Sequence, residues 1–210
     1  PRMTVNDSAQ CLFQNQYIFS DVSEDSFGVI NRLWNINNEK SEKSESVNYR
    51  FASDGFKQIS LWVESQMGCV DTLEQAVYVK PMPNPMFAPL RDYYCEESGK
   101  FQLIPVTPGG FFNGKNVVSF DLVPTILWKD TITYSVTVNG CTDSSSQSTW
   151  IYPYPRVNWG PDTLMCKDEI LELNINNWNT QYIWDDGSKL PSRRIVKSGL
   201  YWVVANNICG

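Results

Sequence analysis

Residues 182–188, YIWDDGS, place two adjacent carboxylates, Asp185 and Asp186, between a tryptophan and a glycine. Paired carboxylates can perform general acid–base catalysis. Glycoside hydrolysis needs them about 5–9.5 Å apart across the substrate, which usually takes two different elements of the fold. Neighbouring Asp residues before a Gly more often form a turn, because Asp bonds to nearby backbone and Gly adopts positive φ. The pattern favours a turn over a catalytic pair.

Other catalytic and metal-binding patterns are absent from the sequence. A calcium site takes about six to eight oxygen ligands. No dense D-x-D-x-D loop is present, so the two carboxylates above, and Asp21 and Asp25, are interpreted as turn residues, with calcium binding the less favoured alternative. The chain contains no histidine, the usual general base and the ligand of most zinc and copper sites. We expect a non-enzymatic chain without catalytic residues, metal or cofactor.

Composition limits the classes of protein to which the chain can belong. The 210 residues are 42% hydrophobic and 13% aromatic, enough for one large domain or two to three small ones. A net charge of −6 argues against nucleic-acid binding, and the only basic pair, Arg193–Arg194, is interpreted as part of a solvated loop. No apolar run approaches the ~18 residues of a membrane span. Because residue 1 is Pro, we expect processing or excision, with any targeting signal outside this segment.

The six cysteines contain no C-x-x-C pair, which disfavours metal knuckles and redox motifs. An even number with alternating long and short gaps predicts three disulfides between consecutive cysteines, each joining an early strand to the last strand of one module. Such bridges imply an oxidising compartment outside the cytoplasm. The positions are Cys11, Cys69, Cys95, Cys141, Cys166 and Cys209.

An internal repeat sets the predicted architecture. Residues 67–85, MGCVDTLEQAVYVKPMPNP, align without a gap with residues 139–157, NGCTDSSSQSTWIYPYPRV. A third copy begins at 207–210, NICG, and the start of the chain, PRMTVNDSAQC, parallels residues 155–166. We expect a segment from inside a longer tandem array, with the Pro-x-Pro junctions as short, stiff spacers.

Between these repeated segments, apolar and polar residues alternate with the two-residue period of β-strands. Residues 55–65 place Ile59, Leu61 and Val63 on one face, and residues 131–140 alternate in the same way. Further strands are expected within 26–36, 171–187 and 199–207. Frequent turns and the lack of a helical pattern predict an all-β chain of three small Ig-like or PKD-like β-sandwich modules, each with one disulfide. The expected modules are 1–82, 83–154 and 155–210, the last truncated at its C-terminal end.

The residues also resemble a known group of modules. Residues 1–82, with Cys11, Trp34 and the segment 48–72, resemble a PKD domain, although Trp34 is followed by NINNEK and not by the usual Asp-Gly turn. Residues 83–154 look like Ig-like modules of large secreted Bacteroidota proteins, through YYC, PGGFFNG and ITYSVTVNGCTDS. Residues 155–210 are similar to a second module of those proteins, through GPDTLMC, YIWDDGS and SGLYWVV.

This resemblance implies a non-catalytic extracellular role. Proteins of this kind are cell-surface adhesins, gliding-motility proteins or secreted enzymes with accessory modules, and many are exported by type nine secretion. We expect a structural or adhesive module array, with a possibly carbohydrate-binding accessory region of a secreted hydrolase as the alternative. The partners implied are other modules of the same chain, surface polysaccharide, and surface or secretion-apparatus proteins. No individual site residue carries over from the resemblance.

Two sets of surface residues follow from local patterns. Trp62 and Trp202 face away from the apolar side of their strands and are candidates for exposed aromatic contacts, including sugar stacking. Trp34 and Trp184 are expected in sandwich cores, and Trp150 and Trp159 between the second and third modules. Asp, then Ser or Thr, then Ala or an aliphatic residue resembles the O-glycosylation acceptor of exported Bacteroidota proteins. Chance occurrence is the alternative. The candidate acceptors are Ser8, Thr72, Thr131 and Thr163.

Overall fold

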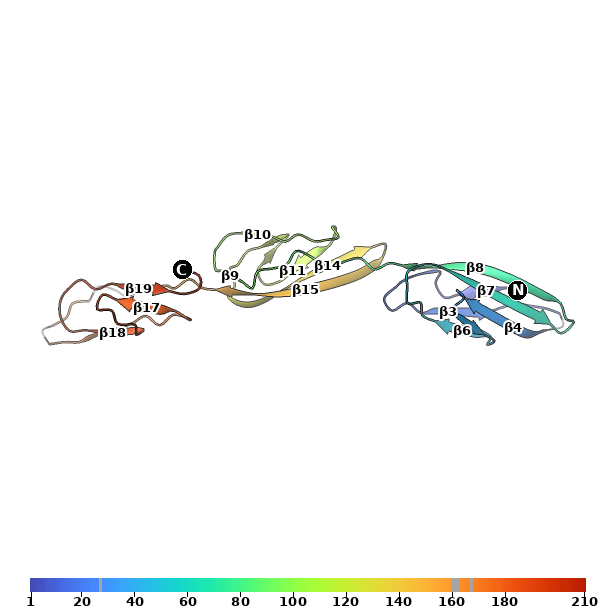
Figure 1. Cartoon of the computed structure of the whole chain (residues 1–210), viewed down its shortest axis with the longest axis horizontal. Coiled ribbons are helices and arrows are strands. Elements are labelled where there is room, and N and C mark those ends of the chain that lie inside the picture. The colour runs from blue at the N-terminus through green and yellow to red at the C-terminus, as the bar shows by residue number, and fades with distance from the viewer. Residues whose placement is uncertain (27, 160–162, 167) are drawn as a thin grey trace. The chain divides into compact units, whose positions relative to one another are not determined.

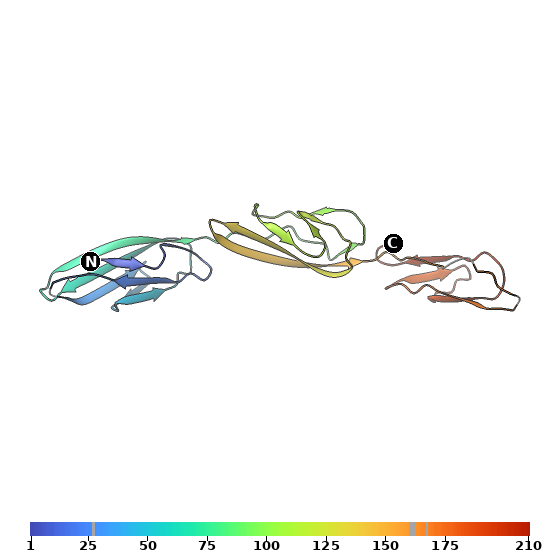
Figure 2. The same ribbon diagram turned by 180° about the vertical axis from the view of Figure 1, so that it is seen from behind.

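The structure, a computed structural model, describes residues 1–26, 28–159, 163–166 and 168–210. Every regular element among them is a β-strand (Figures 1 and 2). None of the described residues forms a helix with the length and apolar character that crossing a membrane requires. The chain forms two compact units. Unit 1 holds Pro1–Pro85, Thr107–Gly110 and Ser135–Ser144, and unit 2 holds Met86–Val106, Phe111–Tyr134 and Ser145–Gly210. The division into three modules stays a prediction.

Unit 1 is built mainly on a five-stranded sheet of order β2-β8-β7-β4-β5 and a three-stranded sheet of order β1-β3-β6. The long neighbours β7 and β8 are antiparallel, whereas the short edge strand β2 runs parallel to β8. The strands are β1 (Met3–Val5), β2 (Ala9–Cys11), β3 (Tyr17–Asp21), β4 (Val29–Ile36), β5 (Lys40–Glu42), β6 (Ser46–Tyr49), β7 (Gly55–Ser65) and β8 (Val70–Lys80).

The two sheets of unit 1 enclose one apolar core, which makes this part a β-sandwich. Alternation in β7 buries Ile59, Leu61 and Val63 on one face, as predicted. Trp34 of β4 is fully buried, and its indole N–H donates to the Ser44 carbonyl at 2.9 Å, so its polar atom is satisfied. The remaining core residues come from both sheets and from the segment that precedes β7: Tyr17, Phe19, Ile36, Val47, Phe51, Val77 and Val79.

The middle of the chain forms a four-stranded sheet of order β11-β14-β15-β9 and a three-stranded sheet of order β10-β13-β12. The edge strand β9 runs parallel to β15, as β2 does to β8. The strands are β9 (Tyr93–Cys95), β10 (Phe101–Gln102), β11 (Phe111–Asn113), β12 (Val117–Val118), β13 (Asp121–Leu122), β14 (Trp128–Val138) and β15 (Cys141–Tyr152).

A buried amide and carboxylate organise the loops next to β14. Asp130 and Asn116 are each 2% exposed. Asp130 accepts from the backbone N–H groups of Lys115 and Asn116 at 3.0 and 2.8 Å. The Asn116 carbonyl oxygen accepts from the N–H groups of Thr125 and Ile126 at 2.8 and 2.7 Å. Because buried polar groups are costly when unpaired, this network fixes residues 115–130 in one conformation.

The last part of unit 2 has two two-stranded sheets, β16-β18 and β17-β19. Their strands are β16 (Leu171–Asn174), β17 (Gln181–Trp184), β18 (Ser192–Ile195) and β19 (Val203–Asn206). A small core of Ile175, Tyr182 and Trp184 lies among them. Trp184 is fully buried, and its indole N–H donates to the Leu190 carbonyl at 2.9 Å. The predicted core positions of Trp34 and Trp184 are both confirmed.

Candidate binding surface

The carboxylates of YIWDDGS lie in a turn after β17. Gly187 has φ +82°, and its N–H donates to the Trp184 carbonyl at 2.8 Å. Asp186 accepts from the Ser188 N–H at 2.9 Å. That hydrogen bond, with the nearby Arg193 charge, holds the pKa of Asp186 below its ordinary value. The Asp186 carboxylate is therefore occupied in closing the turn, as the sequence predicted.

Arg193 is the main partner of this acid pair. Its guanidinium lies 2.9 Å from an Asp185 oxygen and 2.7 Å from an Asp186 oxygen. The side chain is 12% exposed and its cationic carbon lies 5.6 Å from the Trp184 ring centre and 5.2 Å from that of Tyr201. The interpretation of Arg193 as part of a solvated loop was wrong. In β18 it shares a strand face with buried Ile195, because residues two apart point to the same side.

Asp21 is a second structural carboxylate. It accepts from the backbone N–H of Ser23 at 2.9 Å and from Arg32 Nε at 3.0 Å. Burial alone would raise the pKa of Asp21, but these hydrogen bonds and the Arg32 charge hold it below its ordinary value. In the described part of the chain, no group of three or more Cys, Asp or Glu side chains is placed to hold a metal ion.

The disulfides differ from the predicted ones. Cys11 bonds to Cys141 and Cys95 bonds to Cys209, each with a Cα–Cα distance of 5.6 Å. Cys69 and Cys166 are exposed free cysteines. The prediction of three bridges between consecutive cysteines, one inside each module, is wrong.

Strand length explains the difference. Cys11 pairs with Lys80 at the end of β8, whereas Cys69 lies just before β8 begins. An eleven-residue strand spans roughly 33 Å, far beyond the ~4.4–6.8 Å between the Cα atoms of bonded cysteines. Cys95 and Cys141 lie at opposite ends of β15 in the same way. The Cys11–Cys69 and Cys95–Cys141 bridges are therefore geometrically excluded.

The four predicted glycosylation residues, Ser8, Thr72, Thr131 and Thr163, are exposed, as modification requires. The preceding Asp130 has a structural role of its own in the network with Asn116, which accounts for an Asp before Thr131 without glycosylation. The Thr131 hydroxyl lies 3.0 Å from the Ser148 hydroxyl. Glycosylation at the four positions stays a prediction.

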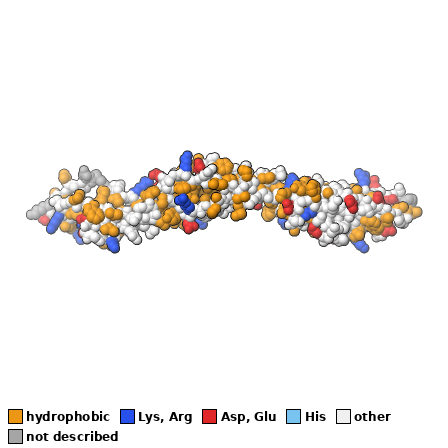
Figure 3. Space-filling model, turned by 45° about the horizontal axis from the view of Figure 1, so that its top comes forward, with side chains coloured by type: hydrophobic (Ala, Val, Ile, Leu, Met, Phe, Trp, Pro, Cys, Tyr) orange, Lys and Arg blue, Asp and Glu red, His pale blue; other side chains and the backbone are white. Residues whose placement is uncertain are grey.

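Large hydrophobic side chains also remain at the surface, interspersed with polar ones (Figure 3). Of the two predicted exposed aromatics, Trp202 is 48% exposed, whereas Trp62 is half-buried, opposite Thr72 in the β7–β8 ladder. Trp150 and Trp159 are 43% and 42% exposed. Trp150 stacks on Tyr152, and Trp159 packs edge-on against Trp184 at 5.7 Å.

Trp202 belongs to a continuous outer face of the β17–β19 sheet. In the register of this pair, Gln181 lies opposite Asn206 and Ile183 lies opposite Val204. The ladder extends one step further, because the Asp185 N–H donates to the Trp202 carbonyl at 3.1 Å. Exposed side chains therefore alternate along both strands, and we call this set the outer face: Gln181, Ile183, Trp202, Val204 and Asn206.

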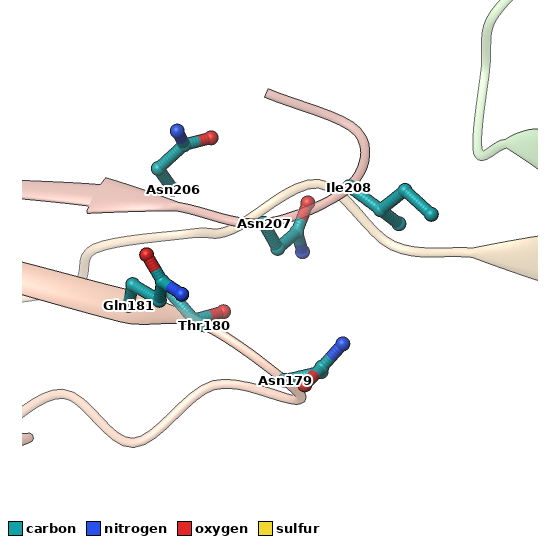
Figure 4. A pocket seen from close by; sticks show the side chains of 6 residues that line it. All are labelled: Asn179, Thr180, Gln181, Asn206, Asn207 and Ile208. Carbon is teal, nitrogen blue, oxygen red and sulfur yellow. The ribbon is translucent and has the colours of Figure 1, made fainter.

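One end of the outer face opens into a hollow of ≈ 310 Å³. Side chains from the start of β17 and the end of β19 flank it (Figure 4). Amide and hydroxyl groups both donate and accept hydrogen bonds, which suits a ligand rich in hydroxyl groups. The lining residues are Asn179, Thr180, Gln181, Asn206, Asn207 and Ile208.

An aromatic stack that the sequence patterns did not single out lies next to this hollow. Trp178 is 38% exposed and stacks on Tyr152 with ring centres 4.5 Å apart and an interplanar angle of 24°. Trp128 packs edge-on against Trp178 at 5.5 Å. Trp178 precedes the hollow residue Asn179, so an exposed indole and several amides adjoin one another. The only sequence signal was a tryptophan in an Asn-rich turn.

No protein-family model matches the chain, and no curated protein matches it. Among solved structures, the PKD1 domain of the Vibrio cholerae metalloprotease PrtV is similar to 37% of this chain, over 91% of its own length, at 20% identity and a TM-score of 0.33. A carbohydrate-binding module of the β-sandwich superfamily is similar to 97% of this chain, over 82% of its own length, at 12% identity and a TM-score of 0.37. A structure from a bacterial ice-binding adhesin of 1.5 MDa is similar to 98% of this chain, over 86% of its own length, at 10% identity and a TM-score of 0.36.

Proposed function

We propose that the chain is a non-catalytic, disulfide-locked structural and adhesive segment of a secreted or cell-surface protein, of the adhesin or gliding-motility type. The observation that carries this proposal is the pair of long-range bridges, with sequence separations of 130 and 114. Persistent disulfides belong to oxidising compartments, so the chain is exported through one. Its partners are further modules of the same kind, surface polysaccharide, and surface or secretion-apparatus proteins.

The bridges suit a load-bearing role because their loops overlap. Residues 11–141 and 95–209 share the segment between Cys95 and Cys141. The shortest covalent path from Cys11 to Cys209 runs through both bridges and that shared segment alone. On the chain-entropy model, each bridge also stabilises the fold by about 4–5 kcal/mol. A chain pulled from its ends therefore resists unfolding and gains little length if it does unfold.

Force spectroscopy tests this role directly. The oxidised chain, pulled by its two ends, is expected to reach about a quarter of the length that the reduced chain reaches at ~3.6 Å per residue. A Cys11→Ser variant provides the matched control, because it removes one loop and should extend further than the native chain. Equal extension with and without reductant would remove the load-bearing proposal.

The second candidate function is carbohydrate binding at the outer face, as in an accessory region of a secreted hydrolase. It is favoured by one observation: the outer face carries the exposed side chains of Trp202, Ile183 and Val204, and its Gln181–Asn206 end opens into the amide-lined hollow. Sugar rings stack on exposed aromatic faces while amides bind their hydroxyls. On a glycan array, Trp202→Ala and Gln181→Ala should each weaken binding, while Trp62→Ala should leave it unchanged. Binding that survives both changes, or no binding by the native chain, contradicts this candidate.

A further inference from the structure

A second hollow adjoins Trp178. Its volume is ≈ 200 Å³, below the about 300–1,000 Å³ of pockets that take drug-sized ligands, so its size suits a single ring. It shares one residue, Asn207, with the amide-lined hollow at the end of the outer face. Its lining includes two apolar side chains, Leu127 and Trp178, and four polar ones, Glu96, Arg156, Asn177 and Asn207.

Hydrogen bonds to the backbone hold the two amides of this lining. The Asn207 amide donates to the Pro153 carbonyl at 2.9 Å. The Asn177 side chain accepts from the Arg156 N–H at 3.2 Å and donates to the Ile175 carbonyl at 2.8 Å. Side chains that are already ordered lose less conformational freedom when a ligand binds. The polar lining is therefore preorganised.

The Cys95–Cys209 bridge ties two sides of the hollow together. Glu96 follows Cys95, and its N–H donates to the Tyr152 carbonyl at 2.8 Å. Asn207 accepts from the Cys209 N–H at 2.8 Å. The disulfide between the two cysteines thus fixes Glu96 and Asn207, which are far apart in sequence, at the edge of one small space.

Arg156 and Glu96 form an ion pair in this lining, with Nη2 of the guanidinium 3.1 Å from Oε2 of the carboxylate. The Glu96 side chain is 17% exposed and that of Arg156 is 66% exposed. Among the residues that the structure describes, this is the one side-chain hydrogen bond of the pair, so Nε and Nη1 of Arg156 and Oε1 of Glu96 are available to a ligand. The pair has no net charge, and it places donors beside an acceptor.

We propose that this hollow is a subsite for one ring of a neutral glycan, whose neighbouring hydroxyl groups bind Arg156 and Glu96 while the ring packs against the indole of Trp178. Each sugar hydroxyl both donates and accepts, which matches a donor beside an acceptor, and aromatic side chains provide an apolar surface for the ring. A uronate is disfavoured, because its carboxylate would meet the negative charge of Glu96.

The shared Asn207 makes the two hollows neighbours, so one glycan chain places adjacent rings in both. The inference rests on the second candidate function, carbohydrate binding at the outer face. It adds to that function a second subsite and the charge class of the ligand.

The test measures binding to an array of neutral and uronate-containing oligosaccharides, followed by titration with the neutral oligosaccharide that the native chain binds best. Arg156→Ala should weaken this binding about tenfold, because it removes charged hydrogen-bond donors. Arg194→Ala is the matched control: this exposed arginine of β18 lies outside the lining of both hollows, and its loss should leave binding unchanged.

Glu96→Gln gives a readout that a structural role would not change. It retains the shape of the side chain but leaves Arg156 without its counter-charge. The variant should therefore bind uronate-containing oligosaccharides about tenfold more tightly than the native chain does, through charge-assisted hydrogen bonds to Arg156. Thermal denaturation checks that each variant is folded, and Glu96→Gln keeps the test decisive if Arg156→Ala does not fold.

Gln181→Ala reports on the first hollow alone. If Gln181→Ala weakens binding and Arg156→Ala does not, the second subsite is overturned while the second candidate function stands. A native chain that binds no oligosaccharide would overturn both. Native binding restricted to uronates, or a folded Glu96→Gln chain that gains no uronate binding, would overturn the proposed neutral subsite.

Discussion

Arg193 forms a two-point ion pair with Asp185, with nitrogen–oxygen distances of 2.9 and 3.1 Å, directly above the buried indole of Trp184. The same guanidinium reaches Asp186. A motif that looks catalytic in sequence is therefore held by a cation from the facing strand. Its carboxylates stabilise a turn, which is a structural role.

Arg193→Ala should lower the free energy of unfolding by about 2 kcal/mol, because it leaves a partly buried carboxylate without its charged donor. Chemical denaturation monitored by tryptophan fluorescence measures this loss. Arg194→Ala is the matched control, since the neighbouring side chain is exposed and should change stability by less than about 0.5 kcal/mol. Equal effects of the two changes would contradict the assigned role of Arg193.

Gly187→Ala should destabilise the chain by about 1 kcal/mol, because an L-residue is strained at φ +82°. Gly199→Ala is the control: its φ is not positive, and an added Cβ would meet only the Tyr201 ring at ordinary contact distances of 3.6–3.8 Å. Thermal denaturation compares them. A loss at Gly199 as large as that at Gly187 would argue against backbone strain as the cause.

Asp21→Asn should cost about 2 kcal/mol at neutral pH, because the ionised carboxylate accepts from Ser23 and Arg32. The folded-state pKa of Asp21 is lowered, so its contribution is complete above the unfolded value of about 3.9 and is lost as pH falls through the folded value. The difference in the free energy of unfolding between the native and Asp21→Asn chains should therefore become smaller below about pH 4. Denaturation at several pH values measures it, and a constant gap down to about pH 2 would contradict this role.

Much of the fold follows from alternation in the sequence. The observed β7 (Gly55–Ser65) coincides with the expected strand, and Ile132, Tyr134 and Val136 of β14 are buried as expected. The two core tryptophans could also be predicted, because each precedes a turn after an apolar strand. Such features depend on residues close together in sequence, where the strand period alone decides which side chains are buried.

The bridges and the candidate surface depend on distances between remote residues. The order of the cysteines in the sequence predicted a Cys11–Cys69 bridge. The parallel pairing of β2 with β8 instead places these two cysteines at opposite ends of β8. The amide hollow joins residues 179–181 to 206–208, and no local pattern brings those segments together.

The disulfide pattern is the central claim, and peptide mapping under non-reducing conditions tests it most directly. Free thiols are first blocked with an alkylating reagent, and the digest is then analysed by mass spectrometry. The structure predicts Cys11–Cys141 and Cys95–Cys209 peptides, with the label on Cys69 and Cys166 of the monomer. Recovery of Cys11–Cys69, Cys95–Cys141 and Cys166–Cys209 in their place would contradict the overlapping bridges and the load-bearing role together.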